Sequence, residues 1–319
     1  MLQNKSTTII SEVKDFFTSS EKAIQTLLTI LSSLTLSEKQ TGLESKSNNQ
    51  VKNINKLLLL LLFPFFGIKD AWHYEGSSLY PALNHGKDIF YRLLNDSSVN
   101  WRKISYKLNR QIIGRAQTDK EKEGQDVQPP RCLIIDDTDL PKTGRKIEMI
   151  GRIFSHVTGK SILGFKGLFM GYHDGKSFFA LDFSLHGEKG KNKKKPFGLT
   201  SKQLRERYSK PRTKDTEAHK RKQEYFTSKI EQMMKMIRTA INKGIRFDYV
   251  LVDSWFTCFA LVKFIKTRRI GTQLIGMAKM GKTRYLFDEK KLTAKEIVNR
   301  LRKSRKTKRS KQLSCYYGE

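Results

Sequence analysis

The stretch RCLIIDDT at residues 131–138 is a short apolar run that ends in two aspartates. A second stretch of the same kind, YVLVD at residues 249–253, follows much later in the chain. Short runs rich in aliphatic and β-branched residues are typical of buried β-strands. The sequence therefore predicts a sheet in which two strands, distant in sequence, each end in carboxylates.

Further predicted elements complete this sheet. Asp174-Gly175 is a hairpin signal between two apolar runs, and Gly244 follows an amphipathic stretch as the residue after a helix C-cap would. The predicted order is strand 131–138, strand 164–172, strand 176–185, helix 216–243, strand 249–253, helix 256–269 and strand 272–279. This order predicts an α/β fold, with a mixed sheet flanked by helices.

The chain before residue 118 has a different pattern. Apolar residues recur there at helical spacing, which predicts a small all-helical domain or an elaborated helical arm over residues 1–117. The run LLLLLLFPFF at 57–66 is too short for a membrane span, which needs about 20 residues, so we expect a buried helix that ends near Pro64. Charged residues and two prolines at 118–130 predict a linker. The expected core of the helical domain includes Trp72, Tyr80, Phe90, Tyr91, Leu94 and Trp101.

The charge of the chain is unevenly distributed. There are 62 Lys and Arg against 31 Asp and Glu, a formal net charge of +31, but residues 1–130 hold 17 basic and 13 acidic residues. Most of the excess lies in two later blocks, 189–222 and 290–311. Either block alone could be a solvated surface, but the total predicts a polyanion partner, usually nucleic acid. The residues predicted to bind DNA are Lys193, Lys194, Lys195, Arg205, Arg207, Arg212, Arg302 and Arg305.

The acidic strand ends suggest a metal site. Strand ends of an open α/β sheet meet at an edge where ligands bind, and neighbouring carboxylates repel unless they share a proton or a cation. Hard oxygen ligands suit Mg²⁺ or Mn²⁺, and two such ions can serve a phosphoryl displacement. The structural alternative is that Asp136 or Asp137 caps a turn and Asp253 caps the helix expected near Phe256. The three cysteines form no CxxC pair, which argues against a zinc site.

Three segments carry a resemblance to a known family. They are LIIDDTDLPKTG at 133–144, GFKGLFMGYHDGKSFFALDFSLHGEKGK at 164–191 and YVLVDSWFT at 249–257. Together they resemble the DDE transposases of bacterial insertion sequences, in the group named after insertion sequence four. The resemblance implies a ribonuclease H-like catalytic core over residues 131–280 and the start of a basic insertion region at 281–319. It also implies that the helical residues 1–117 bind DNA or mediate dimerisation.

The resemblance implies that two aspartates are catalytic and hold the metal ions. The second of them maps to Asp253. The first falls in the DDT triplet, where the usual family spacing selects Asp136 and a variant of that spacing selects Asp137. The implied cofactor is magnesium or manganese, with two ions in a complete site.

The third acid of the family has no match in the sequence. It is a Glu inside a Tyr-x2-Arg-x3-Glu-x6-Lys signature, and Glu289, Glu296 and Glu319 all lack the required Tyr and Arg. Glu289 has the spacing of relatives without the insertion, but DEKK at 288–291 is more typical of a polar turn. We therefore expect a transposase truncated before its catalytic helix.

The leading hypothesis is a transposase that cleaves the ends of an insertion sequence and joins them to target DNA. The alternatives are a DNA-binding remnant without a complete acid triad and a ribonuclease H-like nuclease unrelated to transposition. The resemblance further implies double-stranded DNA as the partner, a homodimer on that DNA, no membrane, and a cytoplasmic, nucleoid-associated location in a bacterium.

Two side chains near the predicted strands have no assigned role. We expect Trp255 to pack in the core, with stacking on a base beside the cleavage site as the alternative. His186 follows a predicted strand, and we expect it, like His156 and His173, to lie in a loop or at the surface.

Overall fold

The computed structural model describes residues 29–44, 51–122, 129–267 and 271–305. Contacts divide the chain into two compact units. The first unit consists of residues 1–125 and 210–223, and the second of residues 126–209 and 224–319. The chain therefore leaves the second unit at residue 210 and returns to it at residue 224.

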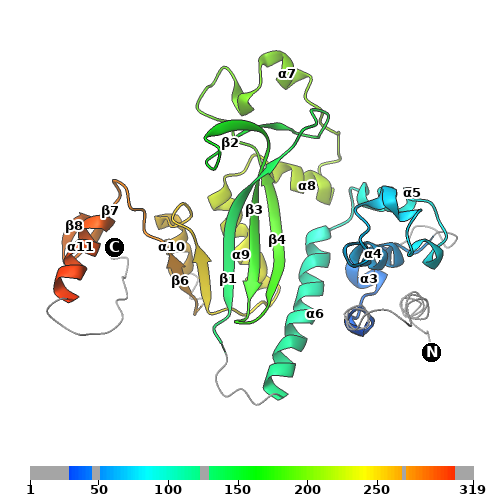
Figure 1. Ribbon diagram of the computed structural model, residues 1–319, viewed down its shortest axis with the longest axis horizontal. Helices are drawn as coiled ribbons and strands as arrows, with labels where there is room; N and C mark the ends of the chain where they lie inside the picture. The colour runs from blue at the N-terminus through cyan, green and yellow to red at the C-terminus, as the bar shows by residue number, and fades with distance from the viewer. Residues whose placement is uncertain (1–28, 45–50, 123–128, 268–270, 306–319) are drawn as a thin grey trace. The chain divides into compact units, whose positions relative to one another are not determined.

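The first unit is helical (Figure 1). Its elements are α3 (Glu38–Thr41), α4 (Asn53–Leu62), η1 (Phe63–Phe66), η2 (Ala71–Tyr74), η3 (Tyr80–Ala82), α5 (Asp88–Leu94), α6 (Trp101–Lys122) and most of α8 (Glu217–Glu224). A hydrogen bond from Asn100 Nδ2 to Glu217 Oε2, 2.9 Å long, holds α8 within this unit. No described helix is both long and apolar enough to cross a membrane.

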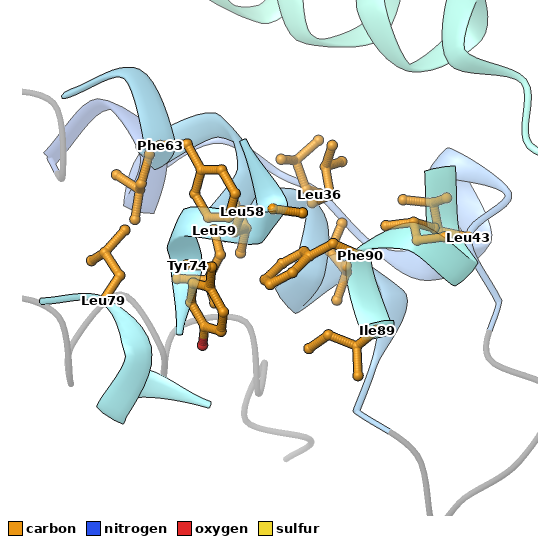
Figure 2. Close-up of a cluster of buried hydrophobic side chains, with 14 of the residues drawn as sticks. Leu36, Leu43, Leu58, Leu59, Phe63, Tyr74, Leu79, Ile89 and Phe90 are labelled. Atoms are coloured by element: carbon orange, nitrogen blue, oxygen red, sulfur yellow. The ribbon is translucent and has the colours of Figure 1, made fainter. Parts of the chain in front are cut away.

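The core of the first unit forms around α4 and α5 (Figure 2). The leucine-rich run is a buried helix that gives way to a 3-10 turn at Phe63, next to Pro64, as predicted. Phe90 of α5 meets the rings of Phe63 and Tyr74 at centroid distances of 5.2 and 4.7 Å, both edge to face. Such aromatic pairs add to the burial energy of the rings.

The predicted core was wrong at three positions. Trp72, Tyr91 and Leu94 are 63%, 38% and 48% exposed. Residues 71–74 make a single 3-10 turn capped by Asp70, and α5 is short and buries Ile89, Phe90 and Leu93. The segment that carries these three side chains contains too little regular helix to turn all of its apolar residues toward the core.

The second unit contains a six-stranded mixed sheet. Its strands are β1 (Cys132–Pro141), β2 (Gly151–Ser155), β3 (Lys160–His173), β4 (Phe178–His186), β5 (Tyr249–Val252) and β6 (Gln273–Gly276). The core order is β4-β3-β1-β5-β6, with β1, β3 and β4 antiparallel and β5 and β6 parallel to β1. This is the ribonuclease H-like arrangement that was predicted, and the fold class is confirmed.

Two helices cover one face of the sheet. α9 (Lys229–Asn242) contacts β3 and β4, and α10 (Phe259–Thr267) contacts α9 and β6. Gly244 follows α9 with a φ of 75°, as its predicted capping role requires. The prediction of one helix over 216–243 was wrong, because Ser228 caps α9 through its side chain and residues 225–228 separate α9 from α8.

The opposite face of the sheet carries exposed aromatic rings. The pairing register places Asp136 of β1, Phe169 of β3 and Phe183 of β4 in one row across three strands. Residues paired in this way point to the same face. Phe169 and Phe183 are 39% and 46% exposed, and their rings stack at 6.0 Å. We call these two rings with Phe178, which is 60% exposed, the aromatic face.

Smaller elements extend the second unit. β2 was not predicted, and it pairs with the first residues of β3 beside a small apolar cluster that includes Phe197 and Tyr225. The other elements are η4 (Pro196–Gly198), α7 (Ser201–Arg205), β7 (Arg284–Phe287), β8 (Lys290–Thr293) and α11 (Ala294–Arg305). β7 and β8 form a separate two-stranded hairpin.

Candidate functional site

The two acidic strand ends lie on neighbouring strands. β1 and β5 pair in parallel from Cys132 and Tyr249 to Ile135 and Val252. Asp136 and Asp253 each follow the last paired residue of their strand, so the pairing register brings these two aspartates to the same level of the sheet.

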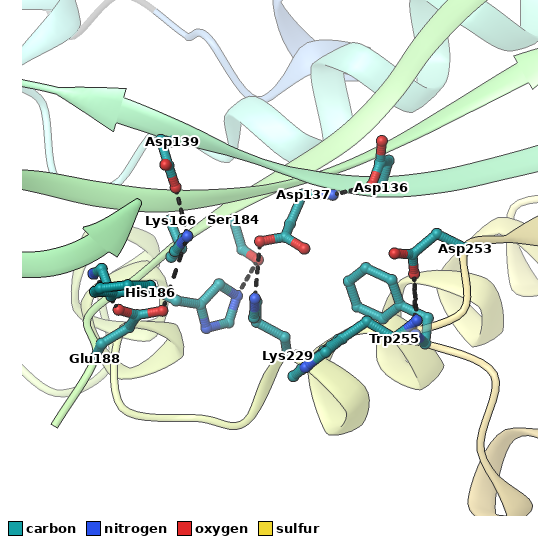
Figure 3. A network of polar contacts seen from close by, with 12 residues as sticks. Asp136, Asp137, Asp139, Lys166, Ser184, His186, Glu188, Lys229, Asp253 and Trp255 are labelled. Atoms are coloured by element: carbon teal, nitrogen blue, oxygen red, sulfur yellow. Dashed lines mark hydrogen bonds and ion pairs between the residues drawn. The ribbon is translucent and has the colours of Figure 1, made fainter. Parts of the chain in front are cut away.

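Consecutive aspartates on β1 point in opposite directions (Figure 3). Asp136 is exposed, and its Oδ1 accepts the backbone N–H of Asp137 at 2.8 Å. The Asp137 side chain is 18% exposed and forms an ion pair with Lys229 Nζ at 2.8 Å. The two candidates for the first acid therefore differ in environment. One faces solvent, and the other is neutralised by a lysine.

Asp253 organises the turn that follows β5. Its Oδ1 accepts the backbone N–H groups of Trp255 and Phe256, each at 3.0 Å. Its carbonyl oxygen accepts the N–H and the hydroxyl of Thr257. The predicted capping contacts exist, but they close a turn, because α10 begins only at Phe259.

Lys229 links the two strand ends. Its ammonium group contacts Asp137 and also lies 4.2 Å from the ring centroid of Trp255, two residues after Asp253. Trp255 is 46% exposed, so the expectation that it packs in the core was wrong. Sequence reasoning missed Lys229. The sequence does carry a signal for this lysine, because Lys229 directly follows Ser228, the N-cap of α9. A cation is unfavourable at a helix N-terminus unless an anion lies close to it.

A buried polar layer continues from Asp137 on the face covered by α9. Lys166 is 4% exposed, and its Nζ lies 2.5 Å from Asp139 and 3.9 Å from Glu188. Burial opposes the ionisation of Asp139, but hydrogen bonds from Lys166 and Ser155 outweigh it and lower the pKa of Asp139. Lys166 was also missed, although strand alternation placed it in phase with the buried Leu168 and Met170.

His186 belongs to the same layer. It is 3% exposed, so the expectation of a loop or surface position was wrong for this histidine. Its Nε2 lies 2.6 Å from Ser184 Oγ, and its Nδ1 lies 2.9 Å from the carbonyl oxygen of Thr227. Burial lowers the pKa of His186. A neutral ring that donates from Nδ1 and accepts the Ser184 hydroxyl satisfies both contacts, and it anchors the segment just before α9.

The late glutamates have local roles. Asp288 and Glu289 have φ values of 46° and 61° between β7 and β8, as expected for the polar turn that was predicted there. Glu296 accepts the N–H and hydroxyl of Thr293, and Thr293 Oγ1 accepts the N–H of Glu296. This is a capping box at the start of α11. Glu319 lies outside the described residues.

The predicted DNA-binding residues are spread over several elements. Lys193, Lys194 and Lys195 are exposed in the loop before η4, and Arg205 is exposed at the end of α7. Arg207 is half-buried, with its guanidinium 4.9 Å from the Phe197 ring centroid and 3.4 Å from the Tyr225 hydroxyl. Arg212 is half-buried in the first unit, and Arg302 is exposed on α11. Arg305 is the last residue of α11.

Oxygen donors for a divalent ion are present at the strand ends. Among the described residues, no group of three or more His, Cys, Asp or Glu side chains is arranged to hold a metal ion. Mg²⁺ is commonly held by one or two carboxylates together with water and substrate phosphates. Asp136 and Asp253 fit this smaller donor set, because both are carboxylates and both directly follow paired positions of neighbouring strands.

The chain matches a family model over most of its length. A family model described as DDE superfamily endonuclease matches residues 75–284, while no curated protein matches the chain. A crystal structure of the Mos1 mariner paired end complex with Mn is 11% identical, with a TM-score of 0.21 over 96% of this chain and 92% of that chain. A pre-cleavage Mos1 transpososome is 10% identical, with a TM-score of 0.17 over 97% and 92%. Since the family model covers well over half of the chain and includes both acidic strand ends, the chain belongs to the DDE superfamily endonuclease family.

Proposed function

We propose that the chain is a DNA transposase of an insertion sequence, in the group named after insertion sequence four. It would cleave the ends of its element and then join their 3′ hydroxyls to target DNA. The observation that carries the proposal is the parallel pairing of β1 with β5, which places Asp136 level with Asp253. Family membership supports the endonuclease part of the proposal.

In the proposed reaction Asp136 and Asp253 present oxygen ligands to magnesium or manganese. Such ions, two in a complete site, would activate the attacking oxygen and stabilise the leaving oxygen of an in-line displacement at phosphorus. The turn hydrogen bonds to Asp253 Oδ1 fix the orientation of that carboxylate before substrate arrives. Lys229 neutralises Asp137 beside them, which reduces the repulsion between carboxylates at this edge.

Asp136 is our choice for the first acid because it is exposed and lies at the level of Asp253. Asp137 is the rival, since Lys229 connects it to Trp255, which follows Asp253 closely. For Asp137 to bind a metal ion, its ion pair with Lys229 would have to open.

A second candidate function is a DNA-binding remnant that cannot cleave. The observation in its favour is that none of the described glutamates after residue 284 joins the strand ends. Glu289 lies in a hairpin turn and Glu296 is engaged in a capping box. In both candidates the basic residues bind double-stranded DNA, and a homodimer forms on that DNA.

The test is cleavage of DNA that carries the element's terminal repeats, in the presence of Mg²⁺ or Mn²⁺. Wild-type protein should cut at the repeat ends, whereas Asp136→Asn and Asp253→Asn should each lower the rate at least about a hundred-fold. Asp288→Asn is the matched control, because Asn tolerates the left-handed backbone of that turn and the position is outside the site. Salt-sensitive binding without any cutting by the wild type would instead establish the DNA-binding remnant.

A further inference from the structure

The hairpin formed by β2 and the start of β3 extends beyond the rest of the sheet. From Gly164 onward β3 pairs with β1, but residues 160–163 pair with β2 alone among the described strands. This hairpin lies near the top of Figure 1. Val157 stands in its tip and is 94% exposed, the largest value among the exposed large hydrophobic side chains of the described residues. The tip is therefore open to a large ligand.

Buried polar contacts fix the base of the hairpin. Ser155 is 3% exposed and hydrogen-bonds to Asp139 of β1. The N–H of Phe154 donates to Glu188 Oε2 at 2.7 Å. Lys166 joins the two acids, with its Nζ 2.5 Å from Asp139 and 3.9 Å from Glu188 (Figure 3). The buried ion pairs, which the proposed reaction does not use, thus hold the hairpin in one orientation.

The same contacts place a basic loop beside the hairpin. This basic loop, residues 189–195, directly follows Glu188 and contains five lysines and no acid, and all five are exposed. It leads into η4, which contacts β2, and a Cβ built on Gly198 would lie 2.7 Å from Arg152 Cβ. Residues 151–163 of the hairpin also contain no acid. The hairpin and the basic loop therefore form one positively charged surface with an apolar tip.

This surface suits duplex DNA in shape and in charge. The major groove is about 12 Å wide and admits a two-stranded β-ribbon, whereas the minor groove is only about 6 Å wide. An apolar tip residue such as Val157 fits the C5-methyl group of thymine, which lies in the major groove. Lysines beside the ribbon suit the phosphates that border the groove.

The hairpin tip also lies at a limited distance from the acidic strand ends. Phe169 of β3 pairs with Asp136, and Lys160 stands nine positions before it at the tip end of the strand. At about 3.3 Å per residue, the tip lies at most roughly 30 Å along β3 from the level of Asp136. With about 3.4 Å per base pair, this length corresponds to about nine base pairs, slightly less than one turn of the duplex.

We propose that the β2–β3 hairpin inserts its tip into the major groove of duplex DNA, with Val157 against the bases and the basic loop on the neighbouring phosphates. The site rests on the proposed function, because the duplex is the DNA that the carboxylates would cut. It adds a groove contact within about nine base pairs of the scissile phosphate.

The first experiment measures duplex binding in EDTA, so that no cleavage is required. The probe is a fluorescently labelled duplex of arbitrary sequence, about three helical turns long, and the readout is anisotropy. Val157→Asp should weaken binding about five- to ten-fold at roughly 0.1 M salt, the size of one lost phosphate contact, because a carboxylate would enter a groove lined by phosphates. The exposure of Val157 makes the variant safe for folding.

Lys176→Ala is the matched control. It also lowers the net charge by one, and Lys176 is exposed in the turn at the opposite end of β3. Its affinity for the duplex should stay within about two-fold of wild type. Equal weakening by Val157→Asp and Lys176→Ala would overturn the proposal, because net charge alone would then explain both. Unchanged binding by Val157→Asp would overturn it as well.

The second experiment identifies the groove by cross-linking of Val157→Cys. The duplexes carry a disulfide-activated thiol tether on adenine N6, in the major groove, or on guanine N2, in the minor groove. Val157→Cys should react with the N6 tether and not with the N2 tether, while wild type and Lys176→Cys measure the background from the chain's own cysteines. Reaction with the N2 tether, or with neither, would overturn the proposal.

A duplex with the element's terminal repeat then tests the distance. The N6 tether that reacts with Val157→Cys should lie within about nine base pairs of the cleavage point, and a reactive position much farther away would contradict the proposed placement. Because both experiments are performed without metal, a failure to cleave counts against the proposed function alone. Cleavage by wild type together with normal duplex binding by Val157→Asp counts against the hairpin alone.

Discussion

Asp136 and Asp137 are adjacent in sequence but experience different surroundings, because a strand turns successive side chains to opposite faces. The sequence could identify the DDT triplet and Asp253, since acids after apolar runs are visible in one dimension. It could not choose between the two aspartates. That choice depends on Lys229, which reaches Asp137 from a helix that begins 92 positions later in the chain.

Replacing Asp137 should mainly lower stability, whereas replacing Asp136 should mainly abolish cleavage. Asp137→Asn removes the charge partner of Lys229, whose side chain is only 15% exposed, and should lower the free energy of unfolding by about 1–3 kcal/mol. Asp136→Asn should leave the free energy of unfolding within about 0.5 kcal/mol, because the residue is exposed, and should abolish cleavage. Urea unfolding and end cleavage, measured on both variants, give the comparison. If Asp137→Asn abolished cleavage and Asp136→Asn retained it, Asp137 would be the first acid.

Lys166 should stabilise the second unit. Replacing it with Met leaves Asp139 and Glu188 without their shared cation and should cost about 3 kcal/mol in urea unfolding at neutral pH. The matched variant is Lys160→Met on the same strand, where the side chain is exposed and a change within about 0.5 kcal/mol is expected. Equal losses in the two variants would contradict a role for the buried ion pairs.

At the scale of elements, the strands that carry the acids were the most predictable part of the chain. Their apolar runs are continuous because the central strands of this sheet are covered on the α9 face and half-covered on the other. The break between α8 and α9 was missed although Ser228 is a local N-cap signal for α9. β2 was missed because it depends on tertiary contacts with the segment around Phe197. Propensity alone does not register such contacts.

The start of β1 is clamped to the start of β5. The Arg131 backbone N–H, Nε and Nη2 donate to the Asp248 carboxylate at 2.9, 3.1 and 2.7 Å. The hydrogen bonds from Arg131 outweigh the effect of burial and lower the pKa of Asp248. A lowered folded-state pKa means that the stabilisation is fully present above the unfolded-state pKa of about 4 and is lost as the pH falls through the folded-state value.

Asp248→Asn should therefore remove part of the acid sensitivity of the second unit. The pair is partly exposed, so we expect a loss of about 1 kcal/mol near pH 7 and almost none at pH values below the folded-state pKa. Urea unfolding as a function of pH, for wild type and variant, measures this difference. A difference that does not change with pH would show that the clamp contributes through packing alone.

Gly187 should be difficult to replace at the end of β4. A Cβ built there would overlap the ring of Tyr225. The two residues are also held together by a hydrogen bond from the Gly187 N–H to the Tyr225 carbonyl oxygen, 3.2 Å long. Gly187→Ala should lower the free energy of unfolding by about 1–3 kcal/mol through overpacking. Gly190→Ala is a less suitable control because of its positive φ, whereas Gly281→Ala meets no atom within 4 Å and should be nearly neutral. Thermal unfolding of both variants tests the difference.

At the scale of the whole molecule, the net charge of +31 was readable from composition, but its distribution over the folded units was not. The block at 189–222 is divided between the units, because residues 210–223 associate with the helical one. Arg207 illustrates the limit of reading charge from sequence. Its guanidinium packs on the rings of Phe197 and Tyr225, so this predicted DNA-binding residue has a packing role within the second unit.

DNA binding should depend steeply on salt. For the triple variant Lys193→Ala, Lys194→Ala, Lys195→Ala, the slope of log Kd against log salt should fall by about 0.9 for each lysine that contacts a phosphate. Fluorescence anisotropy with a duplex from 50 to 200 mM salt, roughly the range over which such contacts lose affinity, measures it. Replacing the same three lysines with Arg should keep the slope. An unchanged slope in the alanine variant would exclude this loop from the DNA interface.

The aromatic face has a practical consequence for the protein in solution. Phe169, Phe178 and Phe183 are exposed on a chain whose strong positive charge keeps copies apart at low ionic strength. Concentrated salt screens that repulsion beyond a few ångströms and leaves the hydrophobic attraction between bare rings intact. Buffers salty enough to strip bound nucleic acid during purification should therefore also be those in which the protein precipitates most readily.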